Sequence, residues 1–319
     1  MGRSRTRILL AGCAAAAALL PVGIAGCAAV AGTDHGAQAI NQAGGAKKAA
    51  PSTPTPTPTP TPPPPPTPHA TNLPWQILVS EGSSTVVDGA QLNVGECAAG
   101  AVTWISALHA RFVLHPGGAE PGGSGWAEPD YVPADQRAEL VATFNGGFRM
   151  VDSGGAFYLD GQQSGTLTTG AASEFFSSTG GLSVGSYGRD GVVGGQTIGV
   201  RQNLGLLVDD GTPTADTAEL GPWGASWGGA TCVRRSGVGV DAAGNTVYAT
   251  GSDLSPRGLA ELLVAAGAVR AMQLDINPNW PSFMYYDQAE SPHLFGDSDQ
   301  SADRYLTPTD RDFVAVYAR

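Results

Sequence analysis

An acidic side chain follows an apolar run in the segment AMQLDINPNW, residues 271–280. Asp275 ends the apolar part, and Asn277, Pro278 and Asn279 continue as a turn. A carboxylate at the end of a buried strand is well placed to act in acid–base or electrostatic catalysis. The alternative is structural, because aspartate also caps the backbone of a following turn.

Two further segments combine glycines with polar side chains. In ATFNGGF, Asn145, Gly146 and Gly147 follow an apolar run. Glycines let the backbone approach a ligand, and asparagine can both donate and accept; the alternative is an ordinary capped turn. In RRSGVGVD, Arg234 and Arg235 enter an apolar run. Their planar forks suit phosphate; the alternative is a surface arginine that pairs with a carboxylate.

Taken in order, these segments resemble the phosphodiester glycosidase domain family. The resemblance comprises a strand ending in Asn-Gly-Gly-Phe, then Arg-Ser-Gly-Val-Gly-Val-Asp, a Leu-rich helix and Ala-Met-Gln-Leu-Asp, within residues 111–319. The chain departs from the family after Asp275, where Ile-Asn-Pro-Asn-Trp stands in place of a glycine-rich turn. It departs again at Arg149, where the family often has a second phenylalanine.

The resemblance implies hydrolysis of a sugar-1-phosphodiester at the anomeric carbon. Phosphate is already a good leaving group, so the reaction needs a carboxylate to direct water or to stabilise an oxocarbenium-like state. It also needs donors that hold the departing phosphate. The catalytic residues implied are Asp275 as the carboxylate, Arg235 as the phosphate clamp and Asn145, and the substrate-binding residues are Gly146, Gly147, Arg234, Asn277 and Trp280.

Other candidate residues remain open. A second carboxylate is sought among Asp152, Asp160 and Asp241, and Trp223, Trp227 and Trp280 are candidates for stacking on a sugar, with core or turn packing as the alternative. We expect no cofactor and no metal site, since the five histidines show no ligand spacing. The expected partner is a carbohydrate or sugar-phosphate substrate. The rival interpretations are a non-catalytic glycan-binding lipoprotein and an exported domain that acts through protein contacts alone.

The elements that must position these residues are short strands between glycine-rich turns. The predicted strands are Trp75–Val79, Gln91–Val94, Arg111–Leu114, Val141–Phe144, Phe157–Leu159, Leu182–Val184, Thr197–Gly199, Gly237–Val240, Val247–Ala249, Ala271–Leu274 and Phe313–Ala318. One helix is predicted with Ser255 as N-cap, Pro256 in the first turn and Gly267 as the stop, and a shorter one in PADQRAELVA, residues 133–142. Each helix leads into a strand that ends in a polar turn. The pattern predicts an α+β fold, a β-rich domain of mixed or antiparallel sheets flanked by a few helices, with both turns on one rim.

The first 69 residues do not read as part of this domain. Three arginines precede an uncharged run over residues 8–32, which is the layout of an export signal. Ile-Ala-Gly-Cys at residues 24–27 resembles a bacterial lipobox, in which Cys27 is lipidated. The alternatives are an uncleaved membrane anchor, since about 20 apolar residues span a bilayer, or plain cleavage. Residues 1–32 are thus predicted to be a signal, lipoprotein or membrane anchor.

Residues 33–69 are predicted to be a disordered linker with a Pro/Thr-rich spacer, PSTPTPTPTPTPPPPPTP, of polyproline type. The glycosidase-like domain would occupy residues 70–319. The expected location is exported, either as a membrane-anchored lipoprotein or secreted, facing the cell wall. The membrane contact would be made through the N-terminal anchor.

The composition of residues 70–319 restricts the partners. They include 12 arginines, no lysine and 27 acidic residues, for a net charge of −15. Nucleic-acid binding needs a basic face and is not expected. Any anionic ligand must be held by local arginines. Cys97 and Cys232 are the two cysteines in this part of the chain; a leftover pair in an exported protein favours a disulfide over two buried thiols.

Overall fold

The computed structural model describes residues 70, 72–214, 220–224 and 229–319 of the 319-residue chain. The predicted leader with Cys27, the Pro/Thr-rich spacer and Trp227 lie outside the described residues. No helix in the described part of the chain is long and apolar enough to cross a membrane.

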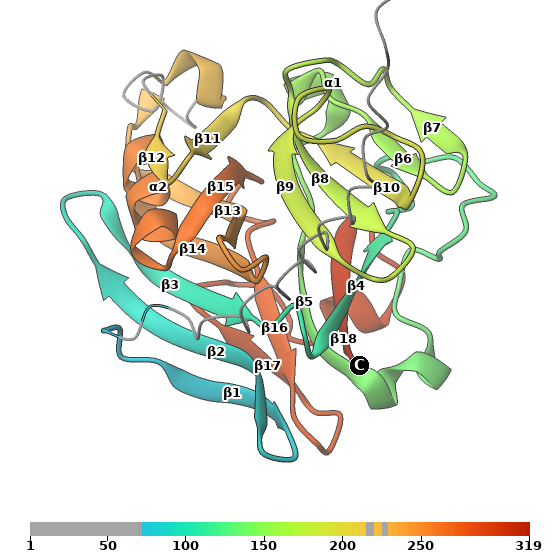
Figure 1. The fold of residues 1–319 in the computed structure, drawn as a ribbon, viewed down its shortest axis with the longest axis horizontal. Helices are drawn as coiled ribbons and strands as arrows, with labels where there is room; N and C mark the ends of the chain where they lie inside the picture. Colours follow the sequence, from blue (N-terminus) through green and yellow to red (C-terminus); the bar gives the residue numbers. More distant parts are fainter. Residues whose placement is uncertain (1–69, 71, 215–219, 225–228) are drawn as a thin grey trace, which may run out of the picture. The chain divides into compact units, whose positions relative to one another are not determined.

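The largest sheet has eight strands in the order β1-β2-β3-β14-β13-β15-β11-β12 (Figure 1). It brings the Arg-Ser-Gly and Gln-Leu-Asp segments together, because β13 pairs with both β14 and β15. Its strands are β1 (Gln76–Glu81), β2 (Ser84–Asn93), β3 (Ala98–Ile105), β11 (Leu206–Asp209), β12 (Thr212–Pro213), β13 (Val233–Asp241), β14 (Thr246–Leu254) and β15 (Ala268–Gln273).

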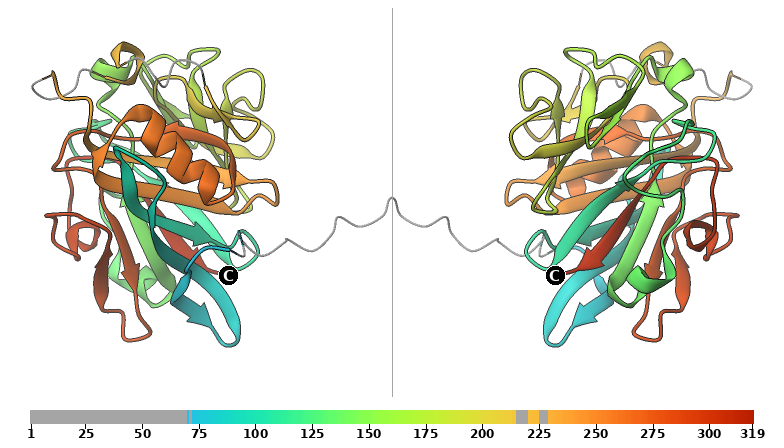
Figure 2. Two further views of the ribbon diagram at one scale, coloured as in Figure 1. Left: turned by 90° about the vertical axis from the view of Figure 1, so that its left-hand side faces the viewer. Right: turned by 90° about the vertical axis from the view of Figure 1, so that its right-hand side faces the viewer.

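The helix α2 (Pro256–Ala265) covers one face of this sheet (Figure 2). Ser255 caps its N-terminus, with its Oγ accepting a 2.9 Å hydrogen bond from the Gly258 N–H, and Gly267 follows the helix with φ +102°. Leu259 and Leu263 are fully buried on the side that meets the sheet. The predicted helix is therefore confirmed, together with its cap and its stop.

Two five-stranded sheets complete the domain, in the orders β7-β6-β10-β8-β9 and β17-β16-β5-β18-β4. The first holds β6 (Phe157–Leu159), β7 (Gln162–Ser164), β8 (Ala172–Ser177), β9 (Leu182–Ser186) and β10 (Thr197–Gln202). The second holds β4 (Ala110–His115), β5 (Leu140–Asn145), β16 (Phe283–Tyr286), β17 (Pro292–Phe295) and β18 (Phe313–Ala318). Short helical turns connect them: α1 (Met150–Ser153), and the 3-10 helices η1 (Ala134–Glu139), η3 (Gly221–Trp223) and η5 (Arg304–Leu306).

One apolar cluster joins all three sheets. Met272 on β15, Phe176 on β8 and Phe144 on β5 are each at most 2% exposed and belong to it. Strand alternation places the side chains of β13–β15 in turn on this cluster and on the one beneath α2. The loops that leave β5 and β15 are therefore anchored in a shared core.

The structure corrects the predicted fold class in part. The domain is rich in strands as expected, but every ladder between named strands in the described residues is antiparallel, so the mixed sheets are absent there. The predicted helix at 133–142 is the 3-10 turn η1. The fold is mostly β, with α2 as its one α-helix longer than four residues in the described ranges.

The predicted disulfide is present. Cys97 and Cys232 are joined across a sequence separation of 135 residues, with their Cα atoms 5.6 Å apart. The bond ties the turn before β3 to the segment that enters β13. Such bonds persist in oxidising compartments, in agreement with an exported domain.

Candidate functional site

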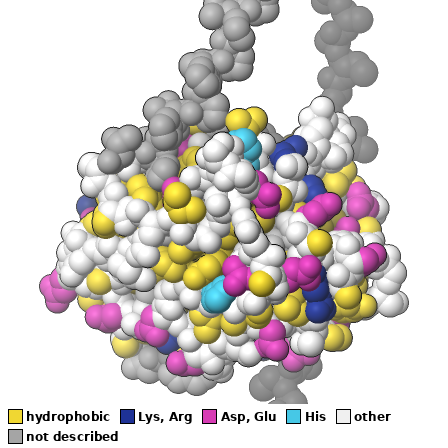
Figure 3. Space-filling view, turned by 90° about the horizontal axis from the view of Figure 1, so that it is seen from below, with side chains coloured by type: hydrophobic (Ala, Val, Ile, Leu, Met, Phe, Trp, Pro, Cys, Tyr) yellow, Lys and Arg dark blue, Asp and Glu magenta, His cyan; other side chains and the backbone are white. Residues whose placement is uncertain are grey.

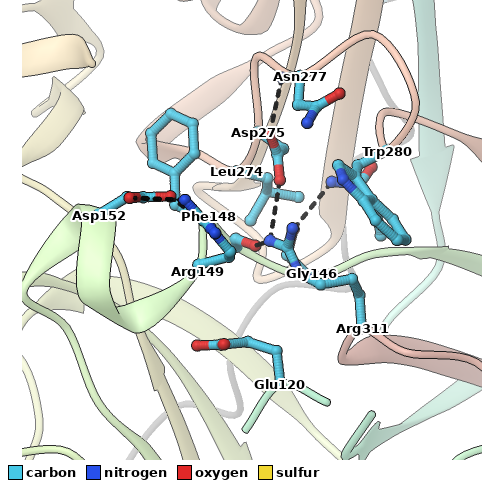
Figure 4. A network of polar contacts seen from close by, with 12 residues as sticks. Glu120, Gly146, Phe148, Arg149, Asp152, Leu274, Asp275, Asn277, Trp280 and Arg311 are labelled. Carbon is cyan, nitrogen blue, oxygen red and sulfur yellow. Dashed lines mark hydrogen bonds and ion pairs between the residues drawn. The ribbon is translucent and has the colours of Figure 1, made fainter. Parts of the chain in front are cut away.

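A cavity of about 930 Å³ opens where the turns after β5 and β15 meet (Figure 4). Its volume is within the range of small-molecule sites. It combines charged groups with apolar ones, and its lining consists of Ala119, Phe148, Arg149, Val151, Asp152, Gly224, Asp275, Ile276, Asn277, Trp280, Asp310 and Arg311. Of the residues singled out from the sequence, Asp275, Asn277, Trp280 and Asp152 line this cavity.

Asp275 is a buried carboxylate with two sets of partners. Its Oδ1 accepts hydrogen bonds from the backbone N–H groups of Ile276 (2.7 Å) and Asn277 (2.8 Å). Its Oδ2 accepts from Arg311 Nη2 at 3.0 Å. The structural and the functional interpretation of Asp275 are therefore compatible. One carboxylate oxygen caps the turn, and the residue also lines the cavity, at 2% exposure.

Burial raises the pKa of Asp275 from 3.8 to about 6, although Arg311 and the two turn N–H groups act in the opposite direction. Burial prevails because removing a charge from water costs more than these partners return. The side chain is therefore ionised at neutral pH but takes up a proton near pH 6. That range suits a group that changes role or charge during a reaction.

Arg311 is the residue of this site that sequence reasoning missed. It precedes β18, and its Nη2 donates to the Gly147 carbonyl (2.6 Å) as well as to Asp275. Its side chain is 10% exposed, and its Nε has no hydrogen-bond partner among the described residues. The signal was an arginine between two aspartates, TDRDF, directly before an apolar strand. Asp275 likewise lies next to a strand end, although it follows β15 whereas Arg311 precedes β18.

Trp280 forms one wall of the cavity beside Arg311. The Arg311 Cζ lies 4.8 Å from the centroid of the indole ring, and Arg304 Cζ lies 4.3 Å from the same ring. Two guanidinium groups therefore stack on one indole, each contact worth about 0.5–2 kcal/mol. Trp223 differs, because it is 2% exposed and packs in the core beneath α2, as its structural alternative predicted.

Three positions were open for a second carboxylate. Asp152 lines the cavity in an exposed ion pair with Arg149 (Oδ2 to Nε, 2.7 Å). Asp160 lines a separate cavity of about 270 Å³, and Asp241 caps the β13–β14 turn by accepting from two backbone N–H groups at 2.9 Å. Asp310, which the sequence did not single out, also lines the main cavity.

The structure does not place Arg235 at this cavity. Its guanidinium is fully buried and donates to the Leu254 carbonyl (2.8 Å) and to Gln273 Oε1 (3.0 Å). Burial without a carboxylate lowers its pKa from 12.5 to about 10. The backbones of the Arg-Ser-Gly and Gln-Leu-Asp segments do meet as predicted, since the Ser236 N–H donates to the Asp275 carbonyl at 2.9 Å. However, strand alternation sends the Arg235 side chain to the opposite face from Ser236.

Arg234 also lies outside the cavity lining. Its Nη1 donates to the Asp297 carbonyl at 2.7 Å, and its Nη2 lies 3.5 Å from a carboxylate oxygen of Asp299. This is the surface-type pairing that was the alternative for the Arg-Arg segment. On the face shown in Figure 3, acidic side chains are scattered and arginines are confined to small groups.

The Asn-Gly-Gly segment supports the cavity from behind. Asn145 is buried and connects three elements, with its Oδ1 accepting from Tyr248 Oη (2.8 Å) and the Ser282 N–H (3.1 Å) and its Nδ2 donating to Ser236 Oγ (3.0 Å). The segment thus meets the chain around Asp275, and the expected common rim is found. Asn145, Gly146 and Gly147 are absent from the cavity lining.

The two glycines leave room for a buried ion pair. A Cβ at Gly146 would lie 2.0 Å from Asp312 Oδ2, and one at Gly147 would lie 3.1 Å from Arg201 Cζ. Arg201 Nε and Asp312 Oδ2 are 2.7 Å apart, and both side chains are 0% exposed. The glycines are therefore needed for close packing on this pair.

Glu174 lies opposite Arg201 in the β8–β10 ladder. Its side chain is fully buried, and neither carboxyl oxygen has a hydrogen-bond partner among the described residues. Burial raises its pKa from 4.5 to about 8, against the attraction of Arg201 and with the repulsion of Asp312. Glu174 is therefore a neutral carboxylic acid at pH 7.

Replacing Glu174 by glutamine should remove a pH dependence of stability. The folded protein holds a proton that the unfolded chain releases between pH 4.5 and about 8, so the free energy of unfolding falls as pH rises through that window. At pH 8, Glu174→Gln should be more stable than the wild type, on the order of 3 kcal/mol. Urea unfolding at pH 5 and pH 8 checks this, with Glu81→Gln as a control at an exposed glutamate. Equal slopes in both proteins would contradict it.

No protein-family model matches the chain, and no curated protein matches its sequence. Among solved structures, the chain is similar to the catalytic domain of zebrafish N-acetylglucosamine-1-phosphodiester alpha-N-acetylglucosaminidase auto-inhibited by its pro-peptide. The two share 16% identity with a TM-score of 0.47, over 77% of this chain and 87% of that one.

A hypothetical protein from Synechocystis is also similar, at 15% identity with a TM-score of 0.40, over 73% of this chain and 62% of that one. At these values no residue role follows from either likeness. The roles of the cavity residues are therefore taken from the geometry of the site and from the motifs in the sequence.

Proposed function

We propose that the chain is an exported hydrolase that cleaves a sugar-1-phosphodiester in an envelope or extracellular glycan. The observation that carries the proposal is the buried Asp275 beside Arg311 in a cavity large enough for a glycosyl phosphodiester. The order of the Asn-Gly-Gly, Arg-Ser-Gly and Gln-Leu-Asp motifs supports it independently. The disulfide and the predicted export signal support the location.

In this proposal Asp275 is the reacting carboxylate. At neutral pH it is ionised, and its negative charge can direct water to the anomeric carbon or stabilise positive charge that develops there. Its two turn N–H donors and Arg311 fix the carboxylate group in one orientation. A preorientated charge need not be rearranged during the reaction.

Arg311 takes the anion-binding role that the sequence had suggested for Arg235. One nitrogen of its guanidinium is engaged with Asp275 and Gly147, and the side chain lines the cavity at 10% exposure. A phosphate diester carries a single negative charge, and arginine binds it with directed N–H donors. Trp280 keeps this guanidinium stacked beside the cavity.

The test is turnover of an N-acetylglucosamine-1-phosphodiester by the purified protein, with release of the reducing sugar as the measured signal. Turnover that depends on Asp275 and Arg311 supports the proposal. Binding of a glycan without hydrolysis of any phosphodiester would instead support the non-catalytic glycan-binding function. The capped state of Asp275 Oδ1 and the bulky Ile276 beside it are the features that favour this second candidate.

Replacing Arg311 by glutamine should shift the pH profile of turnover. If ionised Asp275 is the active form, kcat/KM rises as pH rises through about 6. Arg311 lowers the pKa of Asp275, so its loss should move this limb upward by about one pH unit or more. Profiles of kcat/KM between pH 4 and 9 measure it. Arg235→Gln, at a fully buried arginine outside the cavity, should leave the limb in place; an unmoved limb in Arg311→Gln would contradict the assignment.

A further inference from the structure

Arg201 on β10 connects two chain segments behind the cavity. Its Nε and Nη2 donate to the two carboxylate oxygens of Asp312, at 2.7 and 3.3 Å, and its Nη2 also donates to the Phe148 carbonyl. Its Nη1 donates to the Gln202 carbonyl at 2.7 Å. Arg201 is 0% exposed, and Asp312 and Phe148 are buried as well. The guanidinium is thus fixed by several bonds that water cannot replace.

In both segments, the residue that precedes the Arg201 partner takes part in the contact between Arg311 and Gly147. Asp312 binds Arg201, and the preceding Arg311 lines the cavity. Likewise, the Phe148 carbonyl accepts from Arg201, and the preceding Gly147 carbonyl accepts from Arg311. Arg201 therefore holds the backbone on both sides of the Arg311–Gly147 contact without lining the cavity itself.

A cation in this place is not required by general stability. A buried ion pair adds little net stability compared with well-packed apolar residues, because both charges lose their hydration. A neutral Glu174 beside the pair adds a further polar group that has no hydrogen-bond partner in the described residues. The contact geometry, on the other hand, offers a specific role: it fixes where Arg311 lies relative to Asp275.

We propose that Arg201 is a positioning residue of the candidate site. Through Asp312 and the Phe148 carbonyl it holds the two segments that place the Arg311 guanidinium against Asp275. It acts through Arg311 and does not touch the substrate. The reaction assigned to Asp275 rests on the proposed function, whereas the positioning of Arg311 does not.

The test replaces the ion pair as a unit, Arg201→Met with Asp312→Leu. This change removes one positive and one negative charge, so the direct electrostatic effect on Asp275 nearly cancels, and no buried charge is left unpaired. The measurement is the titration of the Asp275 carboxyl carbon by NMR in protein with ¹³C-labelled aspartate, its signal assigned by its loss in Asp275→Asn. With Arg311 displaced, the pKa of Asp275 should rise by about one unit.

The matched control is Arg235→Met, at the other fully buried arginine that lies outside the cavity. It should lower the thermal unfolding temperature while leaving the Asp275 titration unchanged. Should the double variant not fold, Arg201→Lys keeps the charge but cannot reach both Asp312 and the Phe148 carbonyl, and should raise the Asp275 pKa by a smaller amount. An Asp275 titration that stays at its wild-type midpoint in a folded variant would overturn the proposal.

The two levels of interpretation fail separately. If no phosphodiester is turned over but Asp275 titrates higher in the Arg201 variants, the proposed function is wrong and the positioning role holds. If turnover depends on Asp275 and the titration is unmoved, Arg201 only stabilises the fold. Where turnover exists, the positioning role also predicts that the rise of kcat/KM with pH moves to higher pH in the Arg201 variants, as it does in Arg311→Gln.

Discussion

Asp275→Asn should reduce kcat for a sugar-1-phosphodiester by about 10³-fold, within the range found when a positioned acid–base or charge-stabilising group is removed. Asparagine keeps an oxygen that can accept from the Ile276 and Asn277 N–H groups, so the turn should survive. What is lost is the negative charge that faces Arg311. The measurement is steady-state release of reducing sugar at pH 7.

The control for this prediction is Asp135→Asn, at an exposed aspartate in η1, which should keep wild-type kcat. Near-ultraviolet circular dichroism of the Asp275 variant shows whether the fold is retained. A folded Asp275→Asn protein with a rate within about threefold of the wild type, a barrier change of less than 1 kcal/mol, would remove Asp275 from the reaction. In that case one of the other cavity carboxylates, Asp152 or Asp310, would be the next to test.

Removal of the disulfide should cause a large loss in the free energy of unfolding. Cys97 and Cys232 close a loop with a sequence separation of 135 residues. In the chain-entropy model, a loop of this length contributes about 4–5 kcal/mol by restricting the unfolded chain. The double variant Cys97→Ser, Cys232→Ser should therefore lose about that much free energy of unfolding in guanidinium titrations.

Reduction of the wild-type protein by dithiothreitol offers a check without mutation, since it should reproduce the stability of the double variant. A single variant, Cys97→Ser, should resemble the double variant and free the thiol of Cys232 to react with a maleimide. A loss below about 1 kcal/mol would show that the unfolded chain is already restricted by residual structure.

Some of the fold followed from local rules in the sequence. The strands Phe157–Leu159 and Phe313–Ala318 and the capped helix α2 have the predicted bounds or signals, because their residues prefer these conformations without help from distant contacts. β3 was missed, since AAGAVTWI contains alanine and glycine that have low strand propensity. It is a strand because β2 and β14 pair with it on both sides.

The site was predictable in its chain segments but not in its side chains. Asp275, Asn277 and Trp280 line the cavity because a strand end and its turn already define their positions. Choosing between Arg234, Arg235 and Arg311 required knowing which face of β13 looks inward, and a shift of one residue reverses that face. Arg311, in the segment before β18, reaches Asp275 across 36 positions of the chain. A contact between residues so far apart in the sequence cannot be predicted from a local sequence pattern.

The absence of space at Gly146 links two distant positions of the sequence. Any side chain there would begin 2.0 Å from Asp312 Oδ2 and 2.7 Å from the Asp312 carbonyl oxygen. A smaller side chain at position 312 would relieve the first of these contacts but not the second, which is made by the main chain. Directed evolution of this protein should therefore retain glycine at position 146, whatever residue is selected at position 312.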